Sequence, residues 1–331
     1  MAASLLLMLL GNAAGAAGAG QRGAALFSTT FAPSQGLGPL FNNTSCLGCH
    51  NAPSPGGTGP AGLATVLRVG RIDATRFDPM VGAGGPVGRA HSVAEFGDSC
   101  GLMPGVPSGA NVTSVRNALQ LYGAGEIDSI PDAAILALAE GQSGRPNIVN
   151  GRVGRFGWKA DTPSLRQFVG DAFRNELGLT NPIAPADLVG GCDSGQVDVD
   201  ESVVDAVTTF IGELPRPPAT AGDATVFEAT GCGACHVARV AGVPLYSDLL
   251  IHDMGRALDD GVTQAEAQGE DWRTTPLWGL HQRARFLHDG RARTVEAAIL
   301  AHGGEAEAAV QRFRALSATN RSALMAFLAS L

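Results

Sequence analysis

Lysine, aromatic residues and long apolar runs are all scarce in this chain of 331 residues. Lys159 is the only lysine and the net charge is −8, which excludes the basic face that nucleic acids require. No segment reaches 18 continuous apolar residues, so the sequence predicts no membrane span. Aromatic residues make up 5% of the chain against 45 glycines and 19 prolines, so we expect small cores joined by long irregular stretches.

Cysteine is scarce as well, and four of the six cysteines lie in two copies of one motif. The copies are CLGCH at residues 46–50 and CGACH at residues 232–236. Cys-X-X-Cys-His is the attachment signal for c-type haem, in which both cysteines form thioethers and the histidine binds the iron. A zinc site made from the two cysteine pairs is the alternative, but it leaves the histidine after each pair unexplained. The motifs therefore predict two covalently bound haem c groups, attached by Cys46, Cys49, Cys232 and Cys235, with His50 and His236 as iron ligands.

The start of the chain is typical of an export signal. Residues 4–10 read SLLLMLL and are followed by small residues, although no lysine or arginine precedes Arg22. We predict a signal peptide over residues 1–20. Because haem is attached covalently outside the cytoplasm, the predicted location is the periplasm.

Two cysteines remain outside the motifs. Cys100 and Cys192 both stand in glycine-rich, loop-like contexts. In an oxidising compartment they could pair as a disulfide, but sequence alone does not place them within bonding distance. Two free thiols and a redox-active thiol stay open as alternatives.

Helix signals and a proline-rich linker give the predicted architecture. Asp200 is a good N-cap for a helix with an apolar face, and the prolines near residues 213–223 end that helix and divide the chain. We expect an all-α, loop-rich fold of two cytochrome c-like domains, 21–217 and 218–331, each with one haem. No strand-rich stretch competes with this prediction. The expected helices include 23–29, 200–214, 224–230, 294–302, 305–316 and 319–331.

Several longer segments carry a family resemblance. They include GLGPLFNNTSCLGCHNAP, GRFGWKADTPSLRQ, YSDLLIHDMG, and WRTTPLWGL followed by RFLHDGRARTVEAAILAHGG. Together they resemble the di-haem c-type oxidoreductase family within the bacterial di-haem cytochrome c peroxidase superfamily. The resemblance runs from about Gly23 to the C-terminus and is weakest over residues 52–114.

The resemblance implies that one haem is six-coordinate and relays electrons, while the other offers a site where peroxide binds. At the position of the second axial methionine in the classical peroxidases, this chain has His302. The C-terminal haem therefore resembles a bis-histidine site of His236 and His302, which should lower its potential. Met254 is the rival ligand. The alternatives are a helix-end histidine at position 302 and a packed methionine at position 254.

The N-terminal haem has no histidine at the position where the peroxidases cap this iron, near Pro163. His91 could cap it instead or be a loop histidine, and a five-coordinate or water-bound iron is the working hypothesis. Glu176 and Arg155 are the candidates for the acid that peroxide cleavage requires. Their alternatives are a helix surface charge and a propionate partner. The tryptophan between the haems of the peroxidases is missing near Glu176, and Trp158 is either a relay or a core residue.

The calcium site that the resemblance implies is poorly matched. Asp161 falls near one ligand position, but the partner positions hold Arg283 and Arg285, which repel a cation. Those arginines fit haem propionates better. The further arginines assigned to propionates are Arg273, Arg291 and Arg293, and His288 and Asp289 are expected beside the second haem without binding its iron.

Two functions from different classes follow. The first is a peroxidase-like enzyme in which electrons pass from the C-terminal haem to the N-terminal haem and reduce hydrogen peroxide or oxidise another substrate. Its expected donor is a small cytochrome or a cupredoxin. The second is a di-haem electron-transfer cytochrome in which no substrate binds iron.

Overall fold

The computed structural model describes residues 18–59, 64–74, 76–98, 100–141, 144–189, 196–220 and 222–331. The chain forms two compact units. Unit 1 combines the chain up to Leu121 with Leu165–Leu214, and unit 2 combines Tyr122–Ser164 with Pro215–Leu331. The segment Tyr122–Ser164 thus belongs with the C-terminal part of the chain, although the boundaries drawn from the sequence gave it to the first domain.

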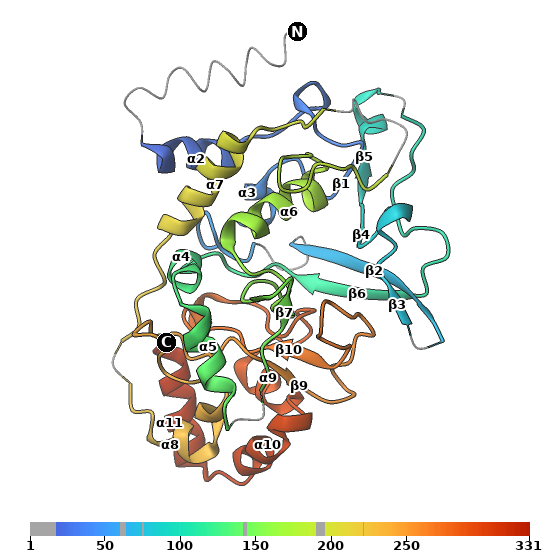
Figure 1. Cartoon of the computed structure of the whole chain (residues 1–331). Coiled ribbons are helices and arrows are strands. Elements are labelled where there is room, and N and C mark those ends of the chain that lie inside the picture. The colour runs from blue at the N-terminus through green and yellow to red at the C-terminus, as the bar shows by residue number, and fades with distance from the viewer. Residues whose placement is uncertain are drawn as a thin grey trace. The chain divides into compact units, whose positions relative to one another are not determined.

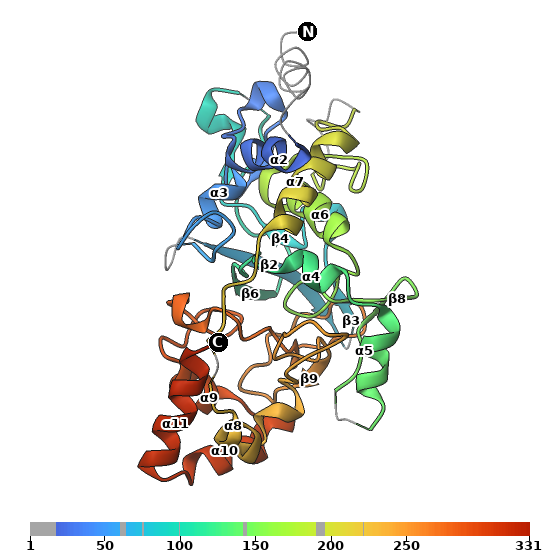
Figure 2. The same ribbon diagram turned by 90° about the vertical axis from the view of Figure 1, so that its left-hand side faces the viewer.

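Unit 1 is built around two helices that pack against each other, α2 (Ala19–Ser28) and α7 (Glu201–Glu213). They lie side by side in both ribbon views (Figures 1 and 2). Asp200 caps α7 by accepting a hydrogen bond from the backbone N–H of Val203, as its position in the sequence predicts. Both helix predictions are confirmed in this region.

The contact between α2 and α7 depends on Gly23. A Cβ atom there would stand 2.0 Å from the carbonyl oxygen of Ala206 and 2.6 Å from the Cβ of Phe210. Only a residue without a side chain lets the two backbones approach this closely. Leu26 and Phe27 of α2 and Val207 of α7 are buried, and the rings of Phe27 and Phe210 lie 5.2 Å apart.

The prediction of an all-α fold is wrong, because unit 1 contains a four-stranded sheet. Strand β2 (Thr65–Asp73) pairs antiparallel with β6 (Val112–Asn117), β3 (Arg76–Asp78) and β4 (Val87–Gly88). These strands lie in the glycine- and proline-rich region that the sequence analysis read as loop. The molecule is a mixed α and β structure, and β-branched residues such as Thr65, Val66 and Val69 are the local strand signal.

The other elements of unit 1 include the first Cys-X-X-Cys-His motif. The motif forms a one-turn helix, and a two-stranded ladder joins residues 40–41 to residues 91–92. Helix α6 packs on α7 and on the first strand of that ladder. These elements are α3 (Cys46–Cys49), α6 (Leu165–Leu177), β1 (Leu40–Phe41) and β5 (His91–Ser92).

Unit 2 repeats the plan of a helix before the motif and a helix at the end of the chain. Helix α8 (Thr225–Thr230) packs on α11 (Ala318–Ala329), with Phe227 and Phe327 in ring contact at 5.1 Å. The remaining helices of unit 2 lie in or near helices predicted from the sequence, or in the segment Tyr122–Ser164. They are α4 (Ala124–Asp128), α5 (Asp132–Ala139), α9 (Val295–Ala301) and α10 (Glu307–Arg314).

Unit 2 also contains strands that the sequence analysis did not predict. The hairpin of β9 (Ile251–Asp253) and β10 (Asp271–Arg273) sets Trp272 directly opposite His252. Side chains opposite each other in an antiparallel pair share one face, so these two rings lie on the same face. A second short ladder joins β7 (Ile148–Val149) to β8 (Arg152–Val153).

Some sequence predictions concern residues that the structure does not describe. Residues 1–17 of the predicted signal peptide and Cys192 lie outside the described residues. Cys100 is disulfide-bonded. Within the described ranges, no helix combines the length and the apolar character needed to cross a membrane.

We predict that Gly23→Ala destabilises unit 1 by about 1–3 kcal/mol, because the added methyl group overpacks the contact between α2 and α7. Gly212→Ala on α7 is the matched control, since its Cβ would meet only Leu165 at 3.7 Å. That control should stabilise by about 0.5–1 kcal/mol through helix propensity. Denaturant unfolding measures both changes, and equal stability of the two variants would contradict the packing argument.

Candidate functional site

The first motif presents its histidine in the geometry of an iron ligand. Ser45 caps the one-turn helix by accepting a hydrogen bond from the N–H of Gly48 at 3.1 Å. His50 is the last residue of the motif and directly follows the helix. Its Nδ1 donates to the carbonyl oxygen of Gly57 at 2.9 Å. This bond fixes the tautomer and leaves Nε2 with its lone pair, as in metal-binding histidines. Burial lowers the pKa of His50, which keeps the ring neutral.

The second motif repeats this arrangement. The Nδ1 of His236 donates to the carbonyl oxygen of Tyr246 at 2.8 Å. Burial lowers the pKa of His236 to about 4, against the opposing effect of its bond to Tyr246, and the charges of His302 and His252 act in the same direction as burial. A neutral ring with a free Nε2 is again the form that binds iron.

His302 lies where it can act with His236. It ends helix α9, whose start is capped by Thr294, and its Nδ1 donates to the carbonyl oxygen of Ala298 at 2.7 Å. Its charge is among the causes that lower the pKa of His236, so the two rings are within electrostatic range of each other. Burial lowers the pKa of His302 too. Unit 2 therefore holds two neutral imidazoles, each with Nδ1 already bonded to a carbonyl.

His91 and Met254 were alternative candidates for iron ligands, and their surroundings differ. His91 lies on β5, where its ring stacks on Phe41 at 5.4 Å and its Nδ1 pairs with Glu95 at 3.0 Å, with almost half of the side chain exposed. Met254 is half-buried, and its carbonyl oxygen lies 3.0 Å from where a Cβ on Gly303 would stand. Met254 is thus close in space to the residue that follows His302.

Glu176 lies beside the first motif, at the end of α6. Its carboxylate accepts a hydrogen bond from the Nδ2 of Asn42 at 2.9 Å, and its backbone carbonyl accepts from the N–H groups of Asn42 and Asn43. Burial raises the pKa of Glu176, against the opposing effects of Asn42 and of the charges on Arg89 and Arg68. Its charge is also felt at Cys49. A carboxyl group with a raised pKa thus stands near Cys49 of the first motif.

Arg155 lies in unit 2, apart from the unit that carries Glu176. Its guanidinium is buried and forms an ion pair with Asp132 and a hydrogen bond to the carbonyl oxygen of Ile130. The side chain therefore ties the start of α5 to the preceding turn.

Four arginines in unit 2 have a buried guanidinium nitrogen that lacks a hydrogen-bond partner: Arg155, Arg273, Arg283 and Arg285. Burial lowers the pKa of both Arg273 and Arg283 to about 10. Orphaned buried donors of this kind fit an anionic group such as a haem propionate. Arg291 differs, because its half-exposed side chain is paired with Asp289 at 2.5 Å.

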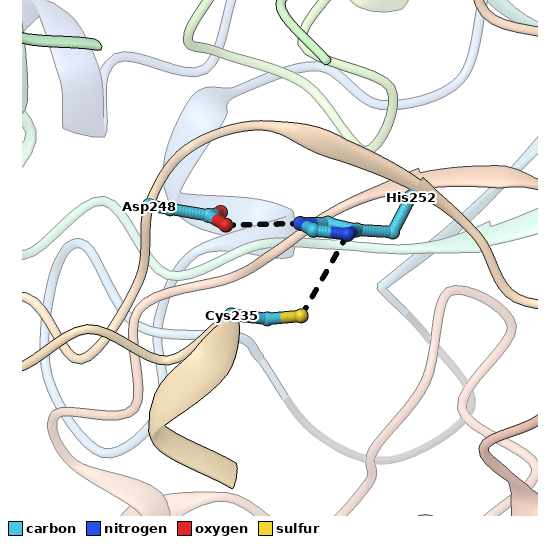
Figure 3. Close-up of side chains that lie close together, drawn as sticks. All are labelled: Cys235, Asp248 and His252. Carbon is cyan, nitrogen blue, oxygen red and sulfur yellow. Dashed lines mark hydrogen bonds and ion pairs between the residues drawn. The ribbon is translucent and has the colours of Figure 1, made fainter. Parts of the chain in front are cut away.

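Among the described residues, one group of potential metal-binding side chains stands out: Cys235, Asp248 and His252 (Figure 3). His252 contacts the Oδ2 of Asp248 through Nε2 at 2.9 Å and the Oε2 of Glu305 through Nδ1 at 2.7 Å. Carboxylates only accept hydrogen bonds, so both ring nitrogens must carry protons. Against burial, which lowers it, the hydrogen bonds and charges of Asp248 and Cys235 raise the pKa of His252 to about 11, and an imidazolium has no lone pair for a metal.

The sequence analysis missed a buried cation beside strand β10. The ammonium of Lys159 is fully buried and donates to the carbonyl oxygens of Gln268, Gly269 and Asp271. It lies 4.2 Å from the centre of the Trp272 ring. That ring also stacks on His288 at 3.8 Å and meets Trp158 edge-on at 6.5 Å. The sole lysine of the sequence was the signal that could have pointed to this role.

Residues 109–198 and 228–331, more than half of the chain, match the family described as "Di-haem oxidoreductase, putative peroxidase". The chain belongs to this di-haem oxidoreductase family. Among curated proteins, none matches the sequence significantly. A solved structure of Kuenenia stuttgartiensis hydrazine synthase, pressurised with 20 bar xenon, matches 95% of this chain and 88% of its own with 14% identity and a TM-score of 0.47. A likeness of this degree decides neither fold nor activity.

Haem is accordingly the cofactor of this di-haem oxidoreductase, and the resemblance inferred from the sequence is confirmed. The residues present fit it, since each unit offers a motif with a neutral histidine and unit 2 offers unsatisfied guanidinium atoms. Calcium finds less support. The carboxylate of Asp161 is hydrogen-bonded to Gln264, and its charge acts on Arg273.

We predict that Lys159→Met lowers the free energy of unfolding by about 3–5 kcal/mol, because it leaves the buried carboxylate of Asp260 and three carbonyls without their cation. The control Arg314→Met removes an exposed cation and should change stability by no more than about 0.5 kcal/mol. Calorimetry of the haem-loaded protein measures both. Equal effects of the two substitutions would mean that the buried ammonium contributes nothing specific.

Proposed function

We propose that this protein is a periplasmic, peroxidase-like oxidoreductase with two covalently bound haem c groups. In this proposal Cys46 and Cys49 attach the first haem, and Cys232 and Cys235 attach the second. His50 and His236 each bind an iron, with His302 as the second ligand in unit 2. The bound haems would supply a substrate-reactive iron at the first motif and an electron store at the second.

The observation that supports an enzyme over a simple electron carrier is the difference between the two motifs. In unit 2 a second histidine, His302, has a pKa lowered by burial and would lower the pKa of His236 if it were protonated. In unit 1 the other histidine, His91, is engaged by Glu95 and Phe41. This difference supports His302 as a second ligand at one motif and an open iron at the other.

Glu176 is the residue we assign to proton delivery at the first motif. Its raised pKa favours the protonated form, and Asn42 holds the carboxyl group in one orientation. A carboxylic acid can donate its proton to a departing water molecule. Hydrogen peroxide is the proposed substrate, and the proposed electron donor is a small cytochrome or a cupredoxin.

We expect His302→Ala to remove the low-spin signal of the second haem from the EPR spectrum of the ferric protein, because the iron loses one of two imidazoles. A mixed high-spin and low-spin spectrum before the substitution would support one open and one closed iron. Two low-spin signals that survive the substitution would instead favour the electron-transfer cytochrome. Optical spectra of the same samples provide an independent reading of spin state.

We expect Glu176→Gln to slow the reaction with hydrogen peroxide by about 10²–10⁴-fold, since the amide cannot deliver a proton. Stopped-flow absorbance measures this rate. Glu140→Gln, at an exposed position of unit 2, is the control and should react at the original rate. An unchanged rate in Glu176→Gln, with peroxide still consumed, would remove this residue from the mechanism.

A further inference from the structure

The imidazolium of His252 stands between two carboxylates that come from different parts of unit 2. Its side chain is 2% exposed, and the Asp248 carboxylate on one side is fully buried. The Glu305 carboxylate on the other side has a quarter of its surface exposed. Charge-assisted hydrogen bonds at 2.7–2.9 Å are among the strong polar contacts of a protein interior.

The hydrogen bond of His252 to Asp248 leads to the loop that holds His236. The N–H of Asp248 donates to the carbonyl oxygen of Cys235 at 3.0 Å. Two residues earlier, the carbonyl oxygen of Tyr246 holds the Nδ1 of His236. Asp248 therefore belongs to the short loop that orients the motif histidine.

The hydrogen bond of His252 to Glu305 leads to the turn after His302. Glu305 follows His302 by three residues, and its second oxygen accepts from the N–H of Asp253 at 3.0 Å. The backbones are in close contact here, since a Cβ on Gly304 would lie 2.2 Å from the carbonyl oxygen of Asp253. Glu305 thus fixes the turn after His302 to strand β9.

We propose that His252 is a positioning residue that joins the loop holding His236 to the turn after His302, and so fixes His302 in the place where it would serve as the second ligand. This proposal rests on the proposed function, specifically on His302 as an iron ligand. His252 itself binds neither iron nor substrate. Removing the carboxylate of Glu305 frees the turn after His302, while the second motif and His236 stay unchanged.

The test measures carbon monoxide binding to the reduced, haem-loaded protein, counted per chain. Glu305→Ala is the main variant, because its side chain is partly exposed and the fold should survive its loss. We expect it to bind one more carbon monoxide per chain than the unchanged protein, as should His302→Ala. In the ferric state, the fraction of the second haem without its second ligand should rise on the order of tenfold, the effect of losing one charge-assisted hydrogen bond.

Glu307→Ala is the matched control, two residues further along, where the carboxylate bonds only to Gln311 on the helix surface. It should bind carbon monoxide with the original stoichiometry. His252→Gln removes the bridging cation itself and should act in the same direction as Glu305→Ala.

The outcomes separate this proposal from the function on which it rests. If His302→Ala adds a carbon monoxide site and Glu305→Ala does not, the positioning role of His252 is wrong and the ligand assignment stands. If His302→Ala changes neither the stoichiometry nor the EPR signal, His302 is not a ligand and both statements fall.

Discussion

Irregular backbone, once buried, must find hydrogen-bond donors for its carbonyl groups, and this constraint shapes the whole molecule. With few aromatic residues and many glycines and prolines, the chain builds long stretches that no helix or sheet satisfies. Side-chain donors take over this task. Lys159 bonds three carbonyls, Arg283 bonds those of Pro276 and Trp278, and Asn147 bonds those of Lys159 and Gln264.

The histidines of the candidate site obey the same constraint. His50, His236 and His302 each use Nδ1 to satisfy a backbone carbonyl, which leaves the lone pair of Nε2 available. The hydrogen bond that satisfies the fold thus also leaves each ring in the form that the proposed iron sites require. His252 is the exception, because both of its nitrogens meet carboxylates, which turns it from a ligand into a cation.

The helices could be predicted from the sequence because their signals are local. Asp200 and Thr294 cap the helices that follow them, and Pro215 follows the end of α7, as their sequence positions indicate. The sheet of unit 1 could not be read this way. Strand β2 contains charged residues and a glycine, and its longest pairing is with β6, about 40 residues away, so the decisive contacts are not local.

The residues of the candidate site differ in the same way, since some can be recognised from local sequence and others cannot. The motifs and His302 are readable from short patterns and from the resemblance, whereas the group around His252 is assembled from residues far apart in the chain. Glu305 lies 53 positions from His252, and no local pattern links them. The segment IHDMG drew attention to Met254 as a ligand, while the structure shows that its histidine makes the stronger contacts.

The burial of the only lysine has a consequence for chemical labelling. Its ammonium has no exposed surface, so a reagent specific for side-chain amines has no target in the folded protein. Modification at this position requires unit 2 to open, and the extent of labelling with time therefore reports how often it does so. The protein thus carries its own single-site reporter of opening, without any added probe.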